Sequence, residues 1–389
     1  MNTTAQFTTH YDVLPTKPPP KVARGDRPYP KRTGSLPRNL NDVTPEWLTG
    51  LLQNRYPGVL VRAMETVDVR NGHTTKLRLR LQLNDAGRAA GLPESVCLKS
   101  NWSEGFESGD ICELEARFYH HVANQPGVPA ARAFYADWDA DGSGQGVVVM
   151  EDLALTGGRF GHSTDHLGVE GIALALESLA RLHGVWWDSP RLRELAWLPI
   201  SMQTYIDTEQ LRMMWAYVEA NLPKPSYQAI LPAWMRNDPQ RLVRCFDALA
   251  RHEQRQPPPR CIVHGDSHVG NSFLRPDGER LWLDWQLVRQ GHPWRDVTYL
   301  MLGGLTIEER RRSERELLRH YRDGLLRGGA QNVIDLEAVW GQYRLWPVYG
   351  MQSWIANVDA WGQSGLPMVE RFFTAAEDLE TMDLLEAVA

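Results

Sequence analysis

The apolar residues of this chain follow two different periods, and this change of period limits the folds that the chain can adopt. Leucine alternates with charged or amide residues over 76–83, a pattern typical of a half-buried antiparallel strand. From about residue 169 the apolar residues instead recur at helical spacing, and helices are indicated up to the C-terminus except in a short β-rich insert at 261–288. The sequence therefore predicts an α+β protein, with a mostly antiparallel sheet followed by a mainly helical part.

Shorter signals place the other elements of the first part. A strand is predicted from residue 59 to 69, and Asn71-Gly72, which lies between this strand and the one at 76–83, is a strong hairpin signal. The remaining predicted elements are two strands and a helix, at 95–100, 146–150 and 109–122. Together they make a small sheet with one helix.

Residues 1–38 differ in composition from the rest of the chain. They contain seven prolines and seven lysines or arginines. Proline blocks helix formation and removes backbone donors, so we expect an extended or disordered leader, with regular structure beginning near Leu40. Thr44 and Pro45 then indicate the start of a helix, as N-cap and first helical residue.

Composition argues against several classes of partner. A net charge of −6 and a pI of about 6.1 give no electrostatic reason to bind nucleic acid or an anionic membrane. The four cysteines include no C-x-x-C pair, no apolar run approaches the ~18 residues of a membrane span, and the N-terminus lacks the pattern of a secretory signal. We expect a cytoplasmic protein with reduced thiols. The sequence does not determine its oligomeric state.

Carboxylates and an amide follow the predicted strands of the 261–288 insert. Asp266 and Asn271 lie in the polar loop after an apolar strand, and Asp284 ends a further strand. Phosphoryl transfer to a hydroxyl needs one carboxylate to accept the proton and a second carboxylate with an amide oxygen to hold Mg²⁺. The five-residue spacing from Asp266 to Asn271 is that of the protein-kinase catalytic loop. The insert therefore predicts Asp266 as the base and Asn271 and Asp284 as metal ligands.

These motifs resemble the aminoglycoside phosphotransferase-like family, whose catalytic loop is H-G-D-x-H-x-x-N and whose metal motif is commonly D-W or D-F. Here the loop begins at His264-Gly265-Asp266 and the metal motif is Asp284-Trp285. The E-x-x-F-Y helix at 115–119 is most similar to the ecdysteroid-kinase-like or choline-kinase-like branch. The resemblance implies a protein-kinase-like two-lobed fold. It divides the chain into the leader, a nucleotide-binding N-lobe at 39–150 and a catalytic, acceptor-binding C-lobe at 151–389.

The resemblance also implies a nucleotide site for ATP. Lys99 matches the strand lysine that binds the nucleotide phosphates, and Glu115 matches the helix glutamate that pairs with this lysine. The hinge between the lobes and the phosphate-covering turn would supply further contacts, from Met150, Glu151, Asp152, Gly72, His73 and Thr74. No G-x-G-x-x-G loop is present, so the turn at 71–75 would have to cover the phosphates with one glycine and its hydroxyl groups.

Three neighbouring polar residues fit supporting roles better than chemistry. We expect His264 to hold the catalytic loop through backbone bonds and Asp296, in the family's G-x-P-x-x-D motif, to brace the same loop. His268 stays open between a structural and a direct role. A dinuclear metallophosphatase would share the G-D-x-H run, but the further ligand motifs that it needs are missing from the sequence.

The acceptor is a small molecule with a hydroxyl group, and its class is the least determined feature. We predict a largely apolar alcohol, because aromatic residues gather in the second half of the chain. The ones placed near the substrate are Trp340, Tyr343, Trp346, Tyr349, Trp354 and Trp361. The acidic residues at 377–386 have the spacing of a solvent-facing helix. The alternatives are an aminoglycoside, a choline-like amino alcohol, a hydroxyacyl thioester, or an inactive nucleotide-binding pseudokinase.

Overall fold

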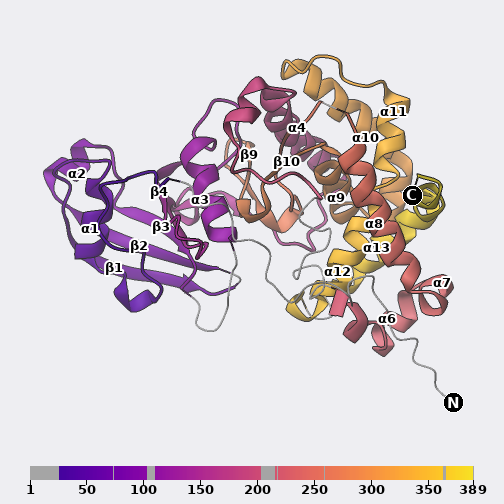
Figure 1. Cartoon of the computed structure of the whole chain (residues 1–389), viewed down its shortest axis with the longest axis horizontal. Coiled ribbons are helices and arrows are strands. Elements are labelled where there is room, and N and C mark those ends of the chain that lie inside the picture. Colours follow the sequence, from indigo (N-terminus) through magenta and orange to yellow (C-terminus); the bar gives the residue numbers. More distant parts are fainter. Residues whose placement is uncertain are drawn as a thin grey trace. The chain divides into compact units, whose positions relative to one another are not determined.

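The computed structural model describes residues 26–72, 74–102, 110–202, 215–216, 218–257, 259–361 and 365–388 (Figure 1). The chain divides into two compact units. We call the first the sheet unit; it comprises the described residues of Pro20–Arg159 and of Phe273–Val288. The second, the helical unit, comprises those of Phe160–Ser272 and Arg289–Ala389.

The sheet unit contains a five-stranded antiparallel sheet with the strand order β1-β2-β3-β5-β4. Its strands are β1 (Val61–Arg70), β2 (Thr75–Leu83), β3 (Ser95–Ser100), β4 (Ala133–Trp138) and β5 (Gly146–Glu151). Its α-helices are α1 (Pro45–Gln53), α2 (Asp85–Ala89) and α3 (Ile111–His121). The hairpin, the strands and the helix expected from the sequence are confirmed, whereas β4 was not predicted.

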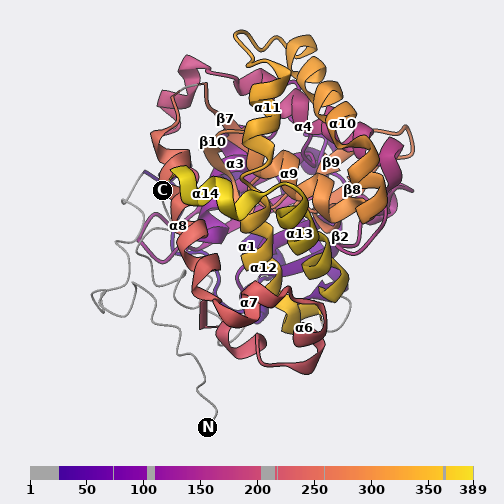
Figure 2. The ribbon, with the colours of Figure 1, turned by 90° about the vertical axis from the view of Figure 1, so that its right-hand side faces the viewer.

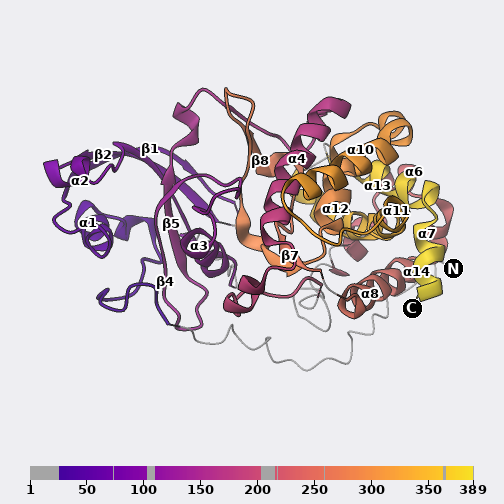
Figure 3. The ribbon, with the colours of Figure 1, turned by 90° about the horizontal axis from the view of Figure 1, so that it is seen from above.

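Alternation along β2 explains how the sheet buries one face. Leu77, Leu79 and Leu81 are buried in a core that also contains Leu48 of α1, while the residues between them are exposed or half-buried. Helix α1 begins as expected, because the Thr44 side chain accepts a hydrogen bond from the backbone of Trp47. Helix α3 packs against β4 and β5 (Figure 3).

The segment before α1 packs earlier than expected. Arg32 forms ion pairs with Asp137 at 2.8 Å and Asp139 at 2.7 Å, and Leu36 is part of the buried core. The Tyr29 ring stacks on Tyr135. The leader was expected to extend to residue 38, but the described residues at its end pack on the sheet unit. There Arg32 is buried against two carboxylates. Residues 1–25 lie outside the described part.

A segment far along the sequence belongs to the sheet unit. Trp285 stacks on Phe118 of α3 with the ring centroids 3.9 Å apart, and its backbone N–H donates to Glu115 at 3.1 Å. The strands β8 (Ser272–Leu274) and β9 (Arg280–Trp282) form a three-stranded sheet with β6 (Arg159–Phe160), in the order β6-β8-β9. Because of these contacts the division of the chain differs from a single break at residue 150.

The helical unit is built from helices around a short two-stranded ribbon. Its helices of eight or more residues are α4 (Gly168–Trp186), α8 (Gln240–Arg255), α9 (Trp294–Gly304), α10 (Ile307–Arg327), α11 (Leu336–Tyr343), α12 (Pro347–Trp361), α13 (Leu366–Asp378) and α14 (Thr381–Val388). Two shorter ones are α6 (Pro225–Ile230) and α7 (Ala233–Asn237). Helix α4 packs along α10, and α12 packs along α13 (Figure 2). The ribbon pairs β7 (Cys261–Val263) with β10 (Arg289–Gly291) antiparallel.

The α+β class and the two-unit organisation predicted from the sequence are confirmed. None of the four cysteines forms a disulfide, which matches the expected reduced thiols. Within the described residues, no helix has the length and apolar character that crossing a membrane requires.

Candidate active site

The catalytic-loop motif follows strand β7 in the helical unit. The Asn271 side-chain amide donates to the backbone carbonyl of Asp266 and to its carboxylate Oδ2, both at 2.9 Å. Asn271 itself ends a single 3-10 turn, η6 (Val269–Asn271), which returns the chain toward Asp266. The structure thus brings together the two residues that the five-residue spacing predicted as a pair.

Two buried residues hold the start of this loop, as expected for His264 and Asp296. His264 accepts the backbone N–H of Asp266 at its ring Nδ1, at 3.2 Å. The Asp296 carboxylate accepts the backbone N–H groups of His264, at 2.6 Å, and of Gly265, at 2.9 Å. Gly265 has φ +85°, a left-handed conformation that glycine adopts without steric cost. The position and direction of Asp266 therefore depend on Asp296.

Asp296 is held in turn by residues of two distant helices. His183 of α4 lies 3.2 Å from its carboxylate through Nε2, and the other ring nitrogen lies 2.7 Å from the hydroxyl of Tyr321 in α10. All three side chains are fully buried. Burial alone would raise the pKa of Asp296, but the hydrogen bond and charge of His183 lower it below its ordinary value. Sequence analysis did not find His183 or Tyr321, because no local pattern connects them to the loop.

His268, left open by the sequence, lies beside the candidate base. Its Nε2 is 3.6 Å from Asp266 Oδ2, and its Nδ1 accepts the backbone N–H of Gly270 at 3.1 Å. The ring meets Trp354 edge to face, with centroids 6.1 Å apart. The Tyr349 hydroxyl donates to the carbonyl of Gly265 at 3.5 Å.

Not all of the aromatic candidates lie near this loop. Trp354 and Tyr349 do, and Tyr299 packs on both of them, a contact that the sequence did not predict. Trp340 and Tyr343 instead stack on each other at the α11 end of the unit. The side chain of Trp361 lies outside the described part.

The second group of candidate residues lies in the sheet unit. The Lys99 ammonium contacts Glu115 at 2.7 Å and Asp284 at 2.7 Å, and its side chain is only 4% exposed. Burial alone would lower the pKa of Lys99, but the charges of Asp284 and Glu115 raise it above its ordinary value. Lysine from β3, glutamate from α3 and aspartate after β9 therefore form one charged cluster. The motifs predicted the pairing of Lys99 with Glu115, but not the contact of Lys99 with Asp284.

Asp284 has an unusual backbone and a second cation. Its φ of 64° and ψ of 59° are left-handed, a conformation that costs energy outside glycine and is often found at functional sites. Lys76 of β2 lies 3.3 Å from Oδ2, while Lys99 contacts Oδ1. Burial would raise the pKa of Asp284, but Lys99 and Lys76 lower it well below its ordinary value, so the carboxylate stays ionised. Lys76 was not predicted as a site residue.

The turn expected to cover the phosphates is more engaged than the sequence suggested. The Thr74 hydroxyl accepts a hydrogen bond from Gln286 at 2.8 Å, and the Thr74 side chain is buried. The Thr75 hydroxyl donates to Asn71 at 3.2 Å. Gly72 donates its backbone N–H to the carbonyl of Thr74. The Thr75 hydroxyl is thus used within the unit, whereas the Thr74 hydroxyl accepts from Gln286 and keeps its own O–H for donation, so the expected phosphate contact of this turn stays a prediction. His73 lies outside the described residues.

The hinge carboxylates are also engaged. Arg78 binds Asp152 through two nitrogens, at 2.9 and 3.1 Å, and Ser95 donates to the same carboxylate at 2.8 Å. Glu151 accepts from Arg275 at 2.5 Å. Met150 is largely buried in β5. The side chains of Glu151 and Asp152 therefore bind within the sheet unit. Backbone groups of this segment are bonded as well, because the Glu151 N–H donates to the carbonyl of Arg132 and the Asp152 carbonyl accepts from the N–H of Leu155.

The donor set fits a magnesium ion. Mg²⁺ prefers oxygen ligands and is usually held by one or two side chains together with substrate phosphates. Asp284 is ionised, as its lowered pKa indicates. Asn271 uses its amide nitrogen for Asp266, which leaves its Oδ1 without a hydrogen-bond partner among the described residues. Asp284 in the sheet unit and Asn271 in the helical unit thus each carry an oxygen atom of the kind that such an ion binds.

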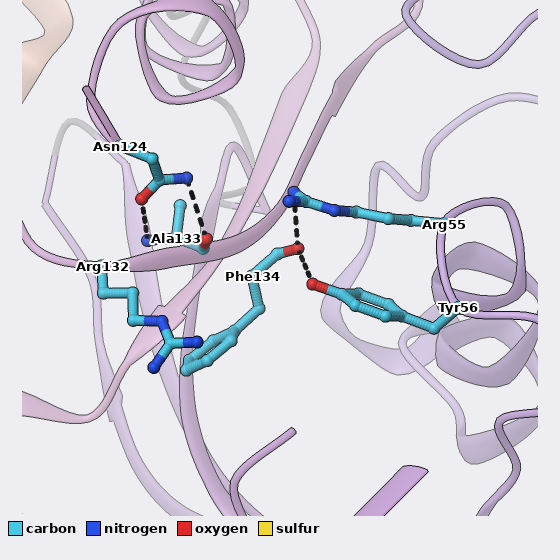
Figure 4. A pocket seen from close by; sticks show the side chains of 6 residues that line it. All are labelled: Arg55, Tyr56, Asn124, Arg132, Ala133 and Phe134. Carbon is cyan, nitrogen blue, oxygen red and sulfur yellow. Dashed lines mark hydrogen bonds between the residues drawn. The ribbon is translucent and has the colours of Figure 1, made fainter. Parts of the chain in front are cut away.

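A hollow of 380 Å³ in the sheet unit is lined by other residues: Arg55, Tyr56, Asn124, Arg132, Ala133 and Phe134 (Figure 4). Arg55 and Tyr56 donate to the carbonyl of Phe134 at 3.0 and 2.6 Å, and Arg132 lies over the Phe134 ring. Much of its polar lining is therefore bonded to the backbone of β4. It includes none of the predicted site residues.

Comparisons with known proteins show the family of the chain. The model of a family described as the phosphotransferase enzyme family (APH) matches residues 106–346. Among curated proteins, no match to the chain was found.

Solved structures of similar fold include kinases of small molecules. A choline/ethanolamine kinase family protein from Mesorhizobium loti is 16% identical, with 86% of this chain and 93% of that chain covered and a TM-score of 0.44. Choline kinase LicA from Streptococcus pneumoniae is 13% identical, with 82% and 94% covered and a TM-score of 0.46. A macrolide 2'-phosphotransferase from Brachybacterium faecium is 14% identical, with 85% and 97% covered and a TM-score of 0.43. At these values the likenesses carry no argument about the substrate.

Proposed function

The chain belongs to the phosphotransferase enzyme family, and from this premise we propose that it is a small-molecule kinase that transfers the γ-phosphoryl group of ATP to a hydroxyl group with Mg²⁺. The observation that carries the proposal is the buried contact of Lys99 with Glu115 and Asp284. In protein kinases, phosphoryl transfer requires the strand lysine, the helix glutamate and the metal aspartate to be in place. All three residues are present here, and the Lys99 ammonium is paired with the carboxylates of Glu115 and Asp284.

We propose that Lys99 binds nucleotide phosphates and that Glu115 keeps its ammonium in position. The adenine would bind to backbone groups of Met150–Asp152, as the family resemblance implies. Asn271 and Asp284 would hold Mg²⁺. When bound, the ion offsets the negative charge of the phosphates and bridges them.

Asp266 is proposed as the general base for the acceptor hydroxyl. Its side chain is 31% exposed, so a substrate can reach it. Oδ2 accepts from Asn271, whereas Oδ1 has no hydrogen-bond partner within the described residues. Oδ1 would therefore accept the proton of the attacking hydroxyl, while Asn271 fixes the carboxylate plane. His268, 3.6 Å from Oδ2, would position the same carboxylate.

We further propose a largely apolar alcohol as the acceptor. Support comes from Tyr299, Tyr349 and Trp354, which pack together beside His268 in the helical unit. Burial of apolar ligand surface against such rings contributes about 25 cal/mol of binding free energy per Å².

The acidic residues near the C-terminus offer little to a cationic acceptor. Asp378 pairs with Arg310 and Arg311, and Asp383 and Glu386 pair with Arg241. Because arginines already neutralise these carboxylates, they are not free to attract a polycation. This favours an apolar alcohol over an aminoglycoside.

The central experiment is acceptor-dependent ADP release with Mg²⁺, for wild type and Asp266→Asn. The amide keeps the shape of the carboxylate but cannot accept the proton, so we expect turnover to fall by about 10²–10⁴-fold. Nucleotide binding, followed by the thermal shift with Mg-ADP, should persist. Asp277→Asn is the matched control, because Asp277 is exposed and lies in a turn between β8 and β9. Equal turnover of Asp266→Asn and the control would refute the assigned base.

The acceptor class is tested by a paired screen at low and high salt. Lipophilic alcohols should support turnover that changes little with salt, because apolar contacts are not screened. If only aminoglycosides or choline-like amino alcohols are turned over, and high salt abolishes this turnover, the acceptor is cationic instead. Nucleotide binding without turnover of any acceptor would favour a pseudokinase.

A further inference from the structure

We propose that Lys76 is a second phosphate-binding lysine of this chain, which occupies Asp284 in the absence of nucleotide and leaves it when metal and phosphate bind. The inference rests on the proposed function, because it concerns the phosphates of the same nucleotide. It assigns a role to a residue that the kinase motifs do not include.

The position of Lys76 follows from the register of the sheet. Lys76 of β2 is the direct partner of Lys99 on β3, so both side chains leave the same face of the sheet. Their ammonium groups contact different oxygens of one carboxylate: Lys99 reaches Asp284 Oδ1 at 2.7 Å, and Lys76 reaches Oδ2 at 3.3 Å. The two lysines therefore contact a single carboxylate, although helix α2 lies between their strands in the sequence.

The other cations on this face of β2 are already paired. Arg78 binds Asp152, and Arg80 binds Glu65 at 2.7 Å. Among the three, Lys76 alone has as its partner a carboxylate that is proposed to bind metal.

The two lysines differ in how firmly they are held. The Lys99 side chain is 4% exposed and also contacts Glu115, whereas the Lys76 side chain is 45% exposed and, within the described residues, has Asp284 as its one carboxylate partner. Without ligand, two ammoniums and two carboxylates balance in charge. A metal ion bound to Asp284 would add positive charge beside Lys76 and compete with its ammonium for the carboxylate. The ammonium then needs another anion, and the nucleotide phosphates are the anions that arrive with the metal.

The phosphate-covering turn leaves this role open. It has one glycine, at Gly72, and the hydroxyls of Thr74 and Thr75 are engaged with Gln286 and Asn71. Where a glycine-rich loop would offer backbone donors, this chain has a cation directly after the turn, at Lys76. Since Lys76 shares the proposed metal aspartate, its ammonium would bind the phosphates that the metal would also hold.

The test compares binding of several probes to wild type and Lys76→Met by isothermal titration. With Mg²⁺ present, we expect ADP and a non-hydrolysable ATP analogue to bind about tenfold more weakly to the variant, since one charge-assisted contact is lost. AMP should bind equally well to both. Mn²⁺ alone, measured by electron paramagnetic resonance, should bind about two- to fivefold more tightly to Lys76→Met, because a competing exposed ion pair has been removed.

The opposite signs separate this role from a structural one, which would weaken both kinds of binding. Arg80→Met is the matched control, with a cation removed from the same face, and should behave like wild type. Lys76→Arg should restore most of the nucleotide affinity. Unchanged nucleotide binding by Lys76→Met, or weaker Mn²⁺ binding, would overturn this inference and leave the kinase assignment intact. Wild-type protein that binds no nucleotide would overturn both.

Discussion

Replacing the carboxylate of Asp296 by an amide should strongly destabilise the helical unit. Its fully buried carboxylate accepts from the backbone of His264 and Gly265 and contacts His183, at 2.6, 2.9 and 3.2 Å. In Asp296→Asn, one of the two acceptor oxygens becomes an N–H donor. At least one of these three groups then loses its acceptor and faces another donor without access to water.

The expected loss can be worked from these contacts. One hydrogen bond to a charged acceptor contributes about 1.5–3 kcal/mol, and a buried donor left without a partner costs about 1–3 kcal/mol more. We therefore expect Asp296→Asn to lower the free energy of unfolding by about 3–5 kcal/mol. Tyr321→Phe is a graded control, because it removes only the hydroxyl next to His183, and it should cost about 1 kcal/mol.

Urea denaturation followed by tryptophan fluorescence measures both variants, and the loss should fall on the transition of the helical unit. The pH dependence gives a second check. Because the pKa of Asp296 is lowered in the folded protein, its contribution is present above the unfolded pKa of about 3.9 and is lost as the pH falls through the folded value. The difference in free energy of unfolding between wild type and Asp296→Asn should therefore become smaller below about pH 4. A loss under about 1 kcal/mol at neutral pH would refute the reasoning.

Three further predictions concern buried groups. Lys99→Met leaves Glu115 buried without its cation, so urea unfolding should show a loss of about 3–5 kcal/mol, and Lys99→Met/Glu115→Leu should recover part of it; no recovery would contradict the pairing. Trp285→Ala should cost about 3–5 kcal/mol by the same assay, and Trp285→Phe much less, since the ring stack is kept; equal losses would contradict a role for the stack. Burial would lower the pKa of His292, but Glu253 raises it above its ordinary value. The contribution of protonated His292 to the free energy of unfolding is therefore full below the unfolded pKa of about 6.5, and it is lost as the pH rises through the folded pKa. His292→Gln should therefore abolish a fall in wild-type stability above about pH 6.5, and an identical pH profile would show that His292 does not cause it.

Local sequence signals predicted the parts of the site whose members lie close along the chain. Asp266 and Asn271 are five residues apart, and a loop of that length between β7 and β8 leaves few ways to separate them. Lys99 and Glu115 are 16 residues apart, on a strand and the next long helix, and the motif order was enough to pair them. For the 71–75 turn, the sequence shows that threonines are present but not that the side chains of Gln286 and Asn71 bind them.

The amino-acid sequence by itself determined the periods of the strands and helices, the α+β class and the chemical types gathered in the 261–288 insert, because these depend on neighbours within a few residues. Tertiary structure alone decided what the outward faces meet. Lys76 and Asp284 are separated by 208 residues, Thr74 and Gln286 by 212, and His183 and Asp296 by 113. Alternation along β2 shows that the Lys76 side chain lies on the face opposite the core. The carboxylate that it contacts, Asp284, comes from a distant segment that only folding brings beside it. For the same reason, the network behind the catalytic loop has no signature in the sequence.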